Sequence, residues 1–298
     1  MLSLALELAA YAALGAWLHA AFGWPFAALV PAAIVAAFGA RFALVCFTST
    51  FGWIAGRPRP PGHRIGVAGV PMYLLREYRS LVADNLFYLP WGFATRPDPP
   101  AVASARPPIL LVHGYFSNRG YFRYLARWLD GQGYGPVFAR NFPVVLSTIE
   151  DFADQLHVEI ERIAAACHQE RVILVCHSMG GLAAREYLRS HGNARLAKLV
   201  TIASPHHGSV LATFGIGANA RQMCRGCDFL ARLEAFEAAG SARVDAVSVY
   251  SLHDNLVAPQ ETSHLPWARR NVTLSGLGHL TIIDAPATFA VLREELGA

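Results

Sequence analysis

Charged residues are scarce in this sequence: they make up 15% of its 298 residues, against about a quarter in an average soluble protein. The shortage is concentrated at the N-terminus, where Glu7 and Arg41 are the only residues between 1 and 54 that are charged at neutral pH. After residue 56 the composition is that of an ordinary globular domain. We therefore expect one substantial domain preceded by a membrane segment.

A concentrated positive charge is also missing. The net charge is +4, and the arginines are scattered along the chain instead of being gathered in a stripe. Proteins that bind nucleic acid carry a basic patch or stripe as their electrostatic footprint. The sequence therefore does not favour a nucleic-acid partner.

Cysteine is too rare, and too irregularly placed, for a disulfide framework. The five cysteines are odd in number and lie mostly in apolar runs. Cys224 and Cys227 form a C-x-x-C, but two further zinc ligands at suitable spacing are lacking nearby. We expect no metal and no cofactor, and interpret the pair as two small residues in a loop.

Two long apolar runs fill the first 56 residues. They cover residues 2–22 and 26–54, are joined by a Gly-Trp-Pro turn, and are each long enough to cross a bilayer, which takes about 20 residues. The start lacks the basic region of a signal peptide. We predict a transmembrane helical hairpin over residues 1–56. Two core helices of a soluble domain are the alternative.

Arginines around the second run suggest how such a hairpin is oriented. A central arginine costs about 2.5–3.5 kcal/mol on insertion scales, so we expect Arg41 to lie off-centre, to snorkel or to face the first helix. Arg57, Arg59 and Arg64 follow the second run, whereas the turn carries no Lys or Arg. The positive-inside rule then places both ends, and the remaining chain, on the cytoplasmic side.

Residues 57–108 connect the hairpin to the domain. Within 73–93, apolar residues recur at helical spacing, which predicts an amphipathic helix. Such a helix fits the membrane interface or the surface of the domain equally well. Residues 96–108 have the composition of a Pro-rich linker.

From residue 109 onward, strand-like and helix-like segments alternate. This pattern predicts an α/β domain over 109–298 with a mostly parallel, doubly wound sheet, in which reactive groups gather at the carboxyl ends of the strands. The predicted strands are 109–112, 136–139, 172–175, 198–202, 246–250 and 272–274. The predicted helices are 121–132, 148–167, 180–191, 229–239 and 286–296.

A serine follows the third of these strands in a tight strand-to-helix turn. The segment VILVCHSMGGLAA changes from a buried strand to a helix at Ser178. Such a turn exposes the serine oxygen and needs small neighbours, which Cys176 and Gly180 provide. A hydroxyl is a weak nucleophile by itself, so Ser178 needs a base and a residue that orients the base.

Two later strand ends provide these partners. Asp254 follows 246–250 and His279 follows 272–274. In the predicted triad Ser178 attacks, His279 transfers the proton, and Asp254 fixes the imidazole tautomer. Asp228, Asp245 and Asp284 are weaker candidates because of their places along the chain. The other nearby histidines are expected to point away from the site or to be polar neighbours of it: His177, His206, His207 and His253.

An oxyanion hole is predicted from backbone amides. The amide of Met179 begins the helix after Ser178, where N–H groups can donate to an anion. Tyr115 follows His113-Gly114 at the end of the first strand and would supply the second amide.

Residues 109–298 resemble bacterial lipases and esterases of the α/β-hydrolase superfamily, of the triacylglycerol lipase type. The resemblance is carried by LLVHGYFSNRGYF, VCHSMGGLAAREYL, LVTIASPHHGS, SLHDNLVAP and GLGHLTI. Cys176 departs from the family's G-x-S-x-G pattern, where the first glycine stands. The resemblance implies the α/β-hydrolase fold and hydrolysis of carboxylic esters through an acyl-enzyme without a cofactor.

Residues 208–240 are expected to form a small cap over the site, or else an ordinary loop on the sheet. With the hairpin, an apolar cap favours hydrophobic or lipid-like esters. Removal of residues 1–56 is then expected to release an active protein from membranes. A membrane protein that uses a hydrolase scaffold only for binding is the alternative function. The sequence does not indicate the oligomeric state.

Overall fold

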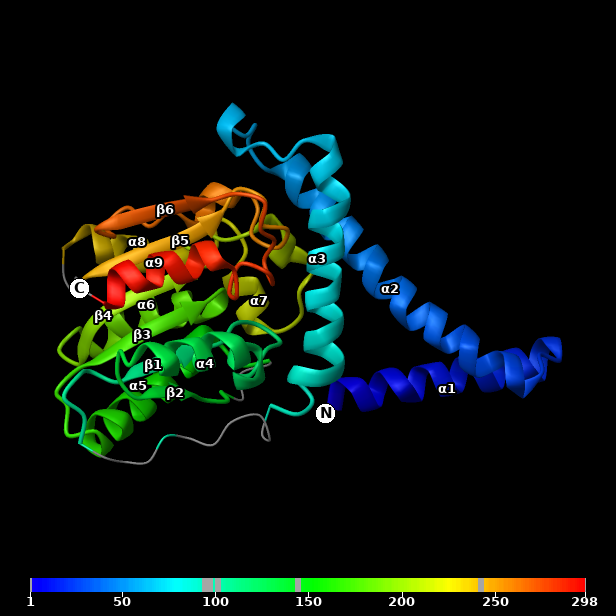
Figure 1. Ribbon diagram of the computed structural model, residues 1–298, viewed down its shortest axis with the longest axis horizontal. Helices are drawn as coiled ribbons and strands as arrows, with labels where there is room; N and C mark the ends of the chain where they lie inside the picture. The colour runs from blue at the N-terminus through cyan, green and yellow to red at the C-terminus, as the bar shows by residue number, and fades with distance from the viewer. Residues whose placement is uncertain (1, 93–98, 100–102, 143–145, 241–243, 298) are drawn as a thin grey trace.

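The computed structural model describes residues 2–92, 99, 103–142, 146–240 and 244–297. Its centre is a six-stranded sheet in which every neighbouring pair is parallel, in the order β2-β1-β3-β4-β5-β6 (Figure 1). The strands are β1 (Ile109–Val112), β2 (Val137–Ala139), β3 (Val172–His177), β4 (Leu196–Ile202), β5 (Ala246–Ser251) and β6 (Arg270–Leu274). The predicted parallel sheet is confirmed, with each strand boundary within two residues of its prediction.

Helices cover both faces of this sheet. Ile109 and Leu111 of β1 pack in one apolar core with α4 (Arg123–Gln132) and α9 (Pro286–Leu296). Leu110 and Val112 point the other way, into a core shared with α5 (Ile149–Ala166), α6 (Met179–His191) and α8 (Asp228–Ala238). This alternation explains why the strands are apolar on every residue: both faces are buried.

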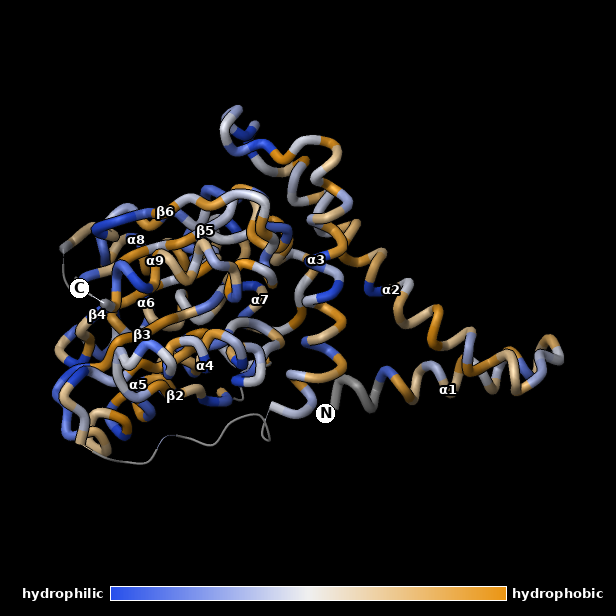
Figure 2. The backbone as a smooth tube through the Cα atoms, in the orientation of Figure 1, coloured by the Kyte–Doolittle hydropathy of each residue, from blue (hydrophilic) through white to orange (hydrophobic). Residues whose placement is uncertain are grey.

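The N-terminal segment folds into two long helices joined by a short turn. α1 (Leu2–Phe22) and α2 (Phe26–Ala55) form a hairpin that projects away from the sheet domain (Figure 1), and hydrophobic colours predominate along it (Figure 2). Arg41 of α2 faces α1, where its guanidinium donates to both carboxylate oxygens of Glu7, at 2.7 and 2.6 Å. Among the described residues, α2 is the helix long and apolar enough to cross a membrane.

A third N-terminal helix, α3 (Val70–Ala83), lies between the hairpin and the sheet domain, transverse to the hairpin (Figure 1). It continues into a π-helical turn, Asp84–Tyr88. Tyr73 and Glu77 are buried against the domain, whereas Met72 and Leu75 are exposed. The predicted amphipathic helix therefore packs on the domain with one face. Residues 93–98 and 100–102, at the end of that prediction and in the predicted linker, lie outside the described residues.

Residues 208–240 divide into two parts. The 3₁₀-helix Val210–Phe214 and α7 (Ala218–Gln222) lie at the carboxyl end of the sheet, while α8 packs on α6 through Leu230 and Leu233 in the core. The other short 3₁₀-helices are Pro61–His63, Val67–Gly69, Arg119–Phe122 and Gln260–Ser263.

Candidate active site

Ser178 occupies a strained turn between β3 and α6. Its φ of 55° and ψ of −126° lie outside the regions that side chains prefer, a conformation that costs about 1–3 kcal/mol and survives only where the surroundings impose it. The surrounding structure is close: a Cβ on Gly180 would lie 2.6 Å from the Val112 carbonyl oxygen, and one on Gly114 would lie 2.7 Å from Ser178 Cβ. The predicted strand-to-helix turn therefore needs glycine at both positions.

His279, which lines the same cavity as Ser178, forms a buried pair with Asp254. The imidazole Nδ1 donates to Asp254, 2.9 Å from Oδ2 and 3.1 Å from Oδ1. The same carboxylate accepts the backbone N–H groups of Leu256 and Val257 through Oδ1, each at 2.8 Å. Because a carboxylate only accepts, Nδ1 carries the proton and Nε2 is left as a free base.

The other acids lie elsewhere. Asp245 pairs with Arg269 and Lys198, at 2.7 and 3.3 Å, and Asp228 begins α8. Asp284 is half-buried, and its partial desolvation raises its pKa to about 7. Of the four sequence candidates, Asp254 is the one hydrogen-bonded to His279.

The pKa of His279 is raised by its surroundings. Burial lowers it, but the negative charge and hydrogen bond of Asp254, with the charge of Glu77, outweigh the burial. A proton taken up by Nε2 is therefore better stabilised here than on a histidine in water, as a general base requires.

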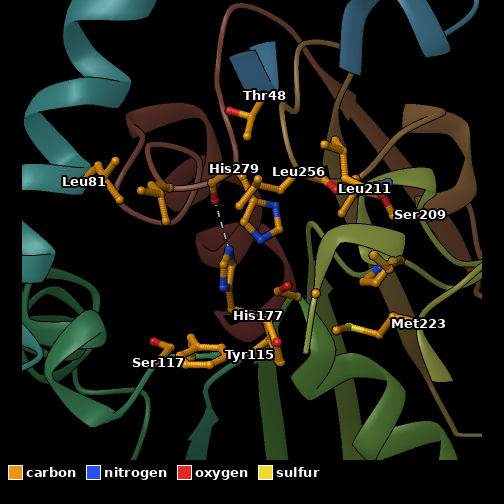
Figure 3. Close-up of a pocket in the computed structure, with 18 of the residues that line it drawn as sticks. Thr48, Leu81, Tyr115, Ser117, His177, Ser209, Leu211, Met223, Leu256 and His279 are labelled. Carbon is orange, nitrogen blue, oxygen red and sulfur yellow. Dashed lines mark hydrogen bonds between the residues drawn. The ribbon is translucent and has the colours of Figure 1, made fainter. Parts of the chain in front are cut away.

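His177 differs from the sequence expectation. Instead of pointing away, it lines the same cavity as Ser178 and His279, and its Nε2 donates to the His279 carbonyl at 3.0 Å (Figure 3). Burial lowers its pKa well below the usual range. It is thus a neutral group that holds the His279 loop in place. His206 and His207 are not among the residues that line this cavity in the described chain.

The loop after β1 lies across the cavity from His279. Tyr115 lines the cavity, and its hydroxyl is tied to the backbone of Ile216 in the cap, donating at 2.6 Å and accepting at 2.8 Å. His113 braces the loop: its Nδ1 donates to the Gly114 carbonyl, and its Nε2 accepts the Phe142 N–H. Burial lowers the pKa of His113 to about 4. Met179 is the first residue of α6, where backbone N–H groups have no partner within the helix.

The cavity has a volume of ≈ 440 Å³ and is walled largely by apolar side chains. One wall comes from the cap, with Leu211, Phe214 and Met223. The opposite wall was not predicted, because it comes from the N-terminal helices: Thr48 of α2 and Leu81 of α3 face the same space as His279 (Figure 3).

Side chains from the N-terminal helices also contact the loops that carry the site. Asn255, next to Asp254, accepts the His279 N–H at 2.9 Å and donates to Thr48 Oγ1 at 3.0 Å. Glu77 accepts from the backbone just after His279. A signal for Glu77 was present in the sequence, since it lies on the same face of its helix as Tyr73 and Leu81.

Cys224 and Cys227 are free thiols whose sulfur atoms contact backbone carbonyls, of Ala220 and Gln222. The described part of the chain contains no cluster of three or more His, Cys, Asp or Glu residues that could hold a metal ion.

Sequence comparisons find similarity to a domain family and to lipases over part of the chain. Residues 143–266 match the model of the PGAP1-like alpha/beta domain family. The chain is 28% identical over 166 residues to a triacylglycerol lipase of Burkholderia plantarii, covering 47% of this chain and 45% of the relative. It is 33% identical over 116 residues to a triacylglycerol lipase of Pseudomonas fragi, covering 37% and 38%. The chain thus spans less than half the length of these curated relatives.

Structural comparisons agree on the fold. The Bacillus licheniformis lipase BlEst2 in its mature form aligns over 67% of this chain and 94% of its own, with a TM-score of 0.54 and 20% identity. Aspergillus fumigatus lipase B aligns over 65% and 53%, with a TM-score of 0.57 and 20% identity. With the sequence matches, these similarities confirm an α/β-hydrolase fold of the lipase and esterase type.

Proposed function

We propose that this chain is a membrane-anchored serine hydrolase that cleaves hydrophobic carboxylic esters through an acyl-enzyme on Ser178. The observation that carries the proposal is the buried Asp254–His279 pair, which leaves Nε2 as a base in the cavity that Ser178 also lines. The similarity to triacylglycerol lipases supports the ester as substrate.

The reaction has two halves. Ser178 Oγ attacks the ester carbonyl while its proton passes to His279 Nε2, and the tetrahedral oxyanion is held by the amides of Tyr115 and Met179. The carbonyl carbon then loses the alcohol, which takes the proton from His279. Water, deprotonated by His279, attacks the acyl-enzyme, and the acid leaves as the serine oxygen regains the proton. Asp254 stabilises the imidazolium in both halves.

The surroundings of the cavity favour apolar acyl groups. Large apolar side chains that line it remain 46% to 61% exposed: Leu44, Phe47, Phe116 and Phe214. Exposed apolar patches of this kind mark interaction sites for lipid or protein. Two of the four belong to α2, the apolar helix, so the cavity opens beside the segment that we propose to insert into the bilayer.

The hairpin α1–α2 is the proposed anchor. Its described side chains are mostly exposed to solvent although they are apolar, which is costly in water and favourable in lipid. The Arg41–Glu7 ion pair keeps the two charges of the hairpin together. The arginines after α2 favour the cytoplasmic side for the hydrolase domain.

A series of p-nitrophenyl esters tests the proposed function. We expect kcat/KM to rise about tenfold or more from acetate to octanoate, because each buried CH₂ contributes about 0.8 kcal/mol. A fluorophosphonate probe should label the wild-type protein. If the folded protein neither hydrolyses the series nor takes up the probe, the scaffold is a binding module and the proposal fails.

Two truncations separate anchoring from catalysis. Removal of residues 1–40 should release the protein from membranes and preserve hydrolysis of soluble esters, because the contacts of α2 with the cavity and the Asp254 loop begin at Leu44. Removal of residues 1–56, which the sequence alone led us to expect would leave an active protein, should instead abolish that hydrolysis, since it takes away Thr48 and the Gly52 carbonyl, which accepts from Gln260. Fractionation and kcat are the measurements. If the protein that lacks residues 1–40 stayed on membranes, another segment would anchor the chain.

A further inference from the structure

Glu77 is a buried carboxyl group for which the described residues provide no Lys or Arg partner. Its side chain is 0% exposed, on the face of α3 that packs against the domain. Burying a carboxylate is costly unless it is paired and hydrogen-bonded. Among the described groups that shift the pKa of Glu77, His279 is the one whose side chain can carry a positive charge.

Among the described residues, both hydrogen bonds of the Glu77 side chain are with the segment that carries His279. Oε1 accepts the N–H of Leu280 at 2.7 Å, and Oε2 accepts the N–H of Thr281 at 3.2 Å. On the other side of His279, a Cβ on Gly278 would lie 2.4 Å from the carboxyl group of Glu77. The carboxyl group therefore fits against the loop only because residue 278 is glycine.

These contacts favour the ionised form. Both oxygens face N–H donors, so a protonated carboxyl would turn its own hydrogen toward one of them. The pKa of Glu77 is raised because burial is the largest effect, and the hydrogen bonds from Leu280 and Thr281 and the charge of His279 offset part of that rise. The arrangement places a second negative charge near the imidazole, in addition to Asp254.

The N-terminal helices α2 and α3 also contact the loop that carries Asp254. The Tyr73 hydroxyl, one turn before Glu77, donates to the His253 carbonyl at 2.7 Å. Gln260 joins the Gly52 carbonyl of α2 to the Asp254 carbonyl, at 3.1 and 2.8 Å. Both loops that bring the base and its orienting acid together are thus fastened to the N-terminal segment.

We propose that Glu77 is a positioning residue for His279: its carboxylate fixes the 278–281 loop and supports the imidazolium that forms when Ser178 gives up its proton. The inference rests on the proposed hydrolase function. In this proposal the N-terminal helices contribute to catalysis by positioning His279, in addition to attaching the domain to a membrane.

The test uses the full-length protein in detergent, a soluble p-nitrophenyl ester, and three variants. Glu77→Gln keeps the length of the side chain and removes the charge. Glu77→Asp keeps the charge but is too short for both amides. Glu186→Gln is the matched control, because Glu186 is equally buried but pairs with Arg189 on α6.

We expect kcat to fall about tenfold in Glu77→Gln, less than the roughly 10²–10⁴-fold that a general base itself contributes, with KM nearly unchanged. The acid limb of the kcat/KM profile should move to lower pH, because the loss of a negative charge lowers the pKa of His279. Glu77→Asp should lose kcat and keep the wild-type acid limb. Glu186→Gln should change neither quantity.

The other groups that face this site stay constant in all variants. Asp254, His177 and Tyr121 face His279 from the β5 loop, β3 and the 3₁₀-helix before α4. Tyr73 and Asp84 flank Glu77 on its own segment, and burial raises the pKa of Asp84 to about 8. A shift seen in Glu77→Gln and not in Glu77→Asp therefore reports the charge of Glu77.

Two outcomes overturn different claims. A wild-type protein that does not hydrolyse the ester removes the proposed function. An active wild type, with Glu77→Gln equal to it in kcat and in the acid limb, removes the role of Glu77 alone. Thermal unfolding identifies a variant that fails to fold. In that case Glu77→Asp decides, and wild-type kcat in that variant would contradict positioning by the two amides.

Discussion

Ser178→Ala is expected to lower kcat for ester hydrolysis by about 10⁶-fold, the loss typical when a triad nucleophile is removed. The residue stands in a positive-φ turn that points its side chain into the cavity, and alanine offers no atom that can form the acyl-enzyme. The fold should survive, because alanine is smaller than serine and Ser178 makes no helix-capping hydrogen bond. Hydrolysis and fluorophosphonate labelling are measured on the same preparation.

Ser190→Ala is the control, since Ser190 is an exposed serine of the same helix that bonds only to the Glu186 carbonyl. It should keep wild-type activity and labelling. Hydrolysis by Ser178→Ala above about 1% of the wild-type rate, or probe uptake by that variant, would place the nucleophile elsewhere.

Asp254→Asn is expected to lower kcat by about 10⁴-fold, the size of the effect seen when a triad acid becomes an amide. The geometry dictates how the new amide is oriented. Asp254 Oδ1 accepts two backbone N–H groups, so the asparagine oxygen must stay there and its NH₂ must face His279 Nδ1. That nitrogen then has to accept, the proton moves to Nε2, and the imidazole can no longer take a proton from Ser178.

Asp245→Asn is the matched control, because Asp245 lies before β5 and is paired with Arg269. Its activity should equal that of the wild type. If Asp254→Asn retained most of its kcat, the imidazole would be oriented by another group, and Glu77 would be the first to examine.

Much of the sheet domain could be predicted because its signals are local. Each buried strand is a short apolar run, and the turn at Ser178 is marked by the small residues around it. The order of the strand ends then indicated which polar residues share an edge of the sheet. The pairing of Asp254 with His279 follows from this edge, although 25 residues separate them.

The N-terminal wall of the site could not be predicted in the same way. Thr48 meets Asn255 across 207 residues of sequence, and Glu77 meets Leu280 across 203. The helical pattern places Glu77 on the same face as Tyr73, but it does not indicate what that face contacts, since a helix that packs on a protein and one that lies in a bilayer have the same apolar face. The prediction that His177 points away from the site is wrong for a related reason. Its orientation is set by the His279 carbonyl, which lies 102 residues away in the sequence and comes near only in the folded chain.

The length of α2 has a mechanical consequence. Thirty residues of unbroken helix extend for about 45 Å, which exceeds the roughly 30 Å of a bilayer's hydrocarbon by some 15 Å. The C-terminal part of α2 contacts the loop of Asp254 and lines the cavity, so the helix is joined to the sheet domain by side-chain contacts as well as by the chain itself. With α2 inserted in the bilayer as we propose, these contacts would fix the height and tilt of the sheet domain above the lipid surface, and the entrance to the cavity would face one leaflet at a constant angle.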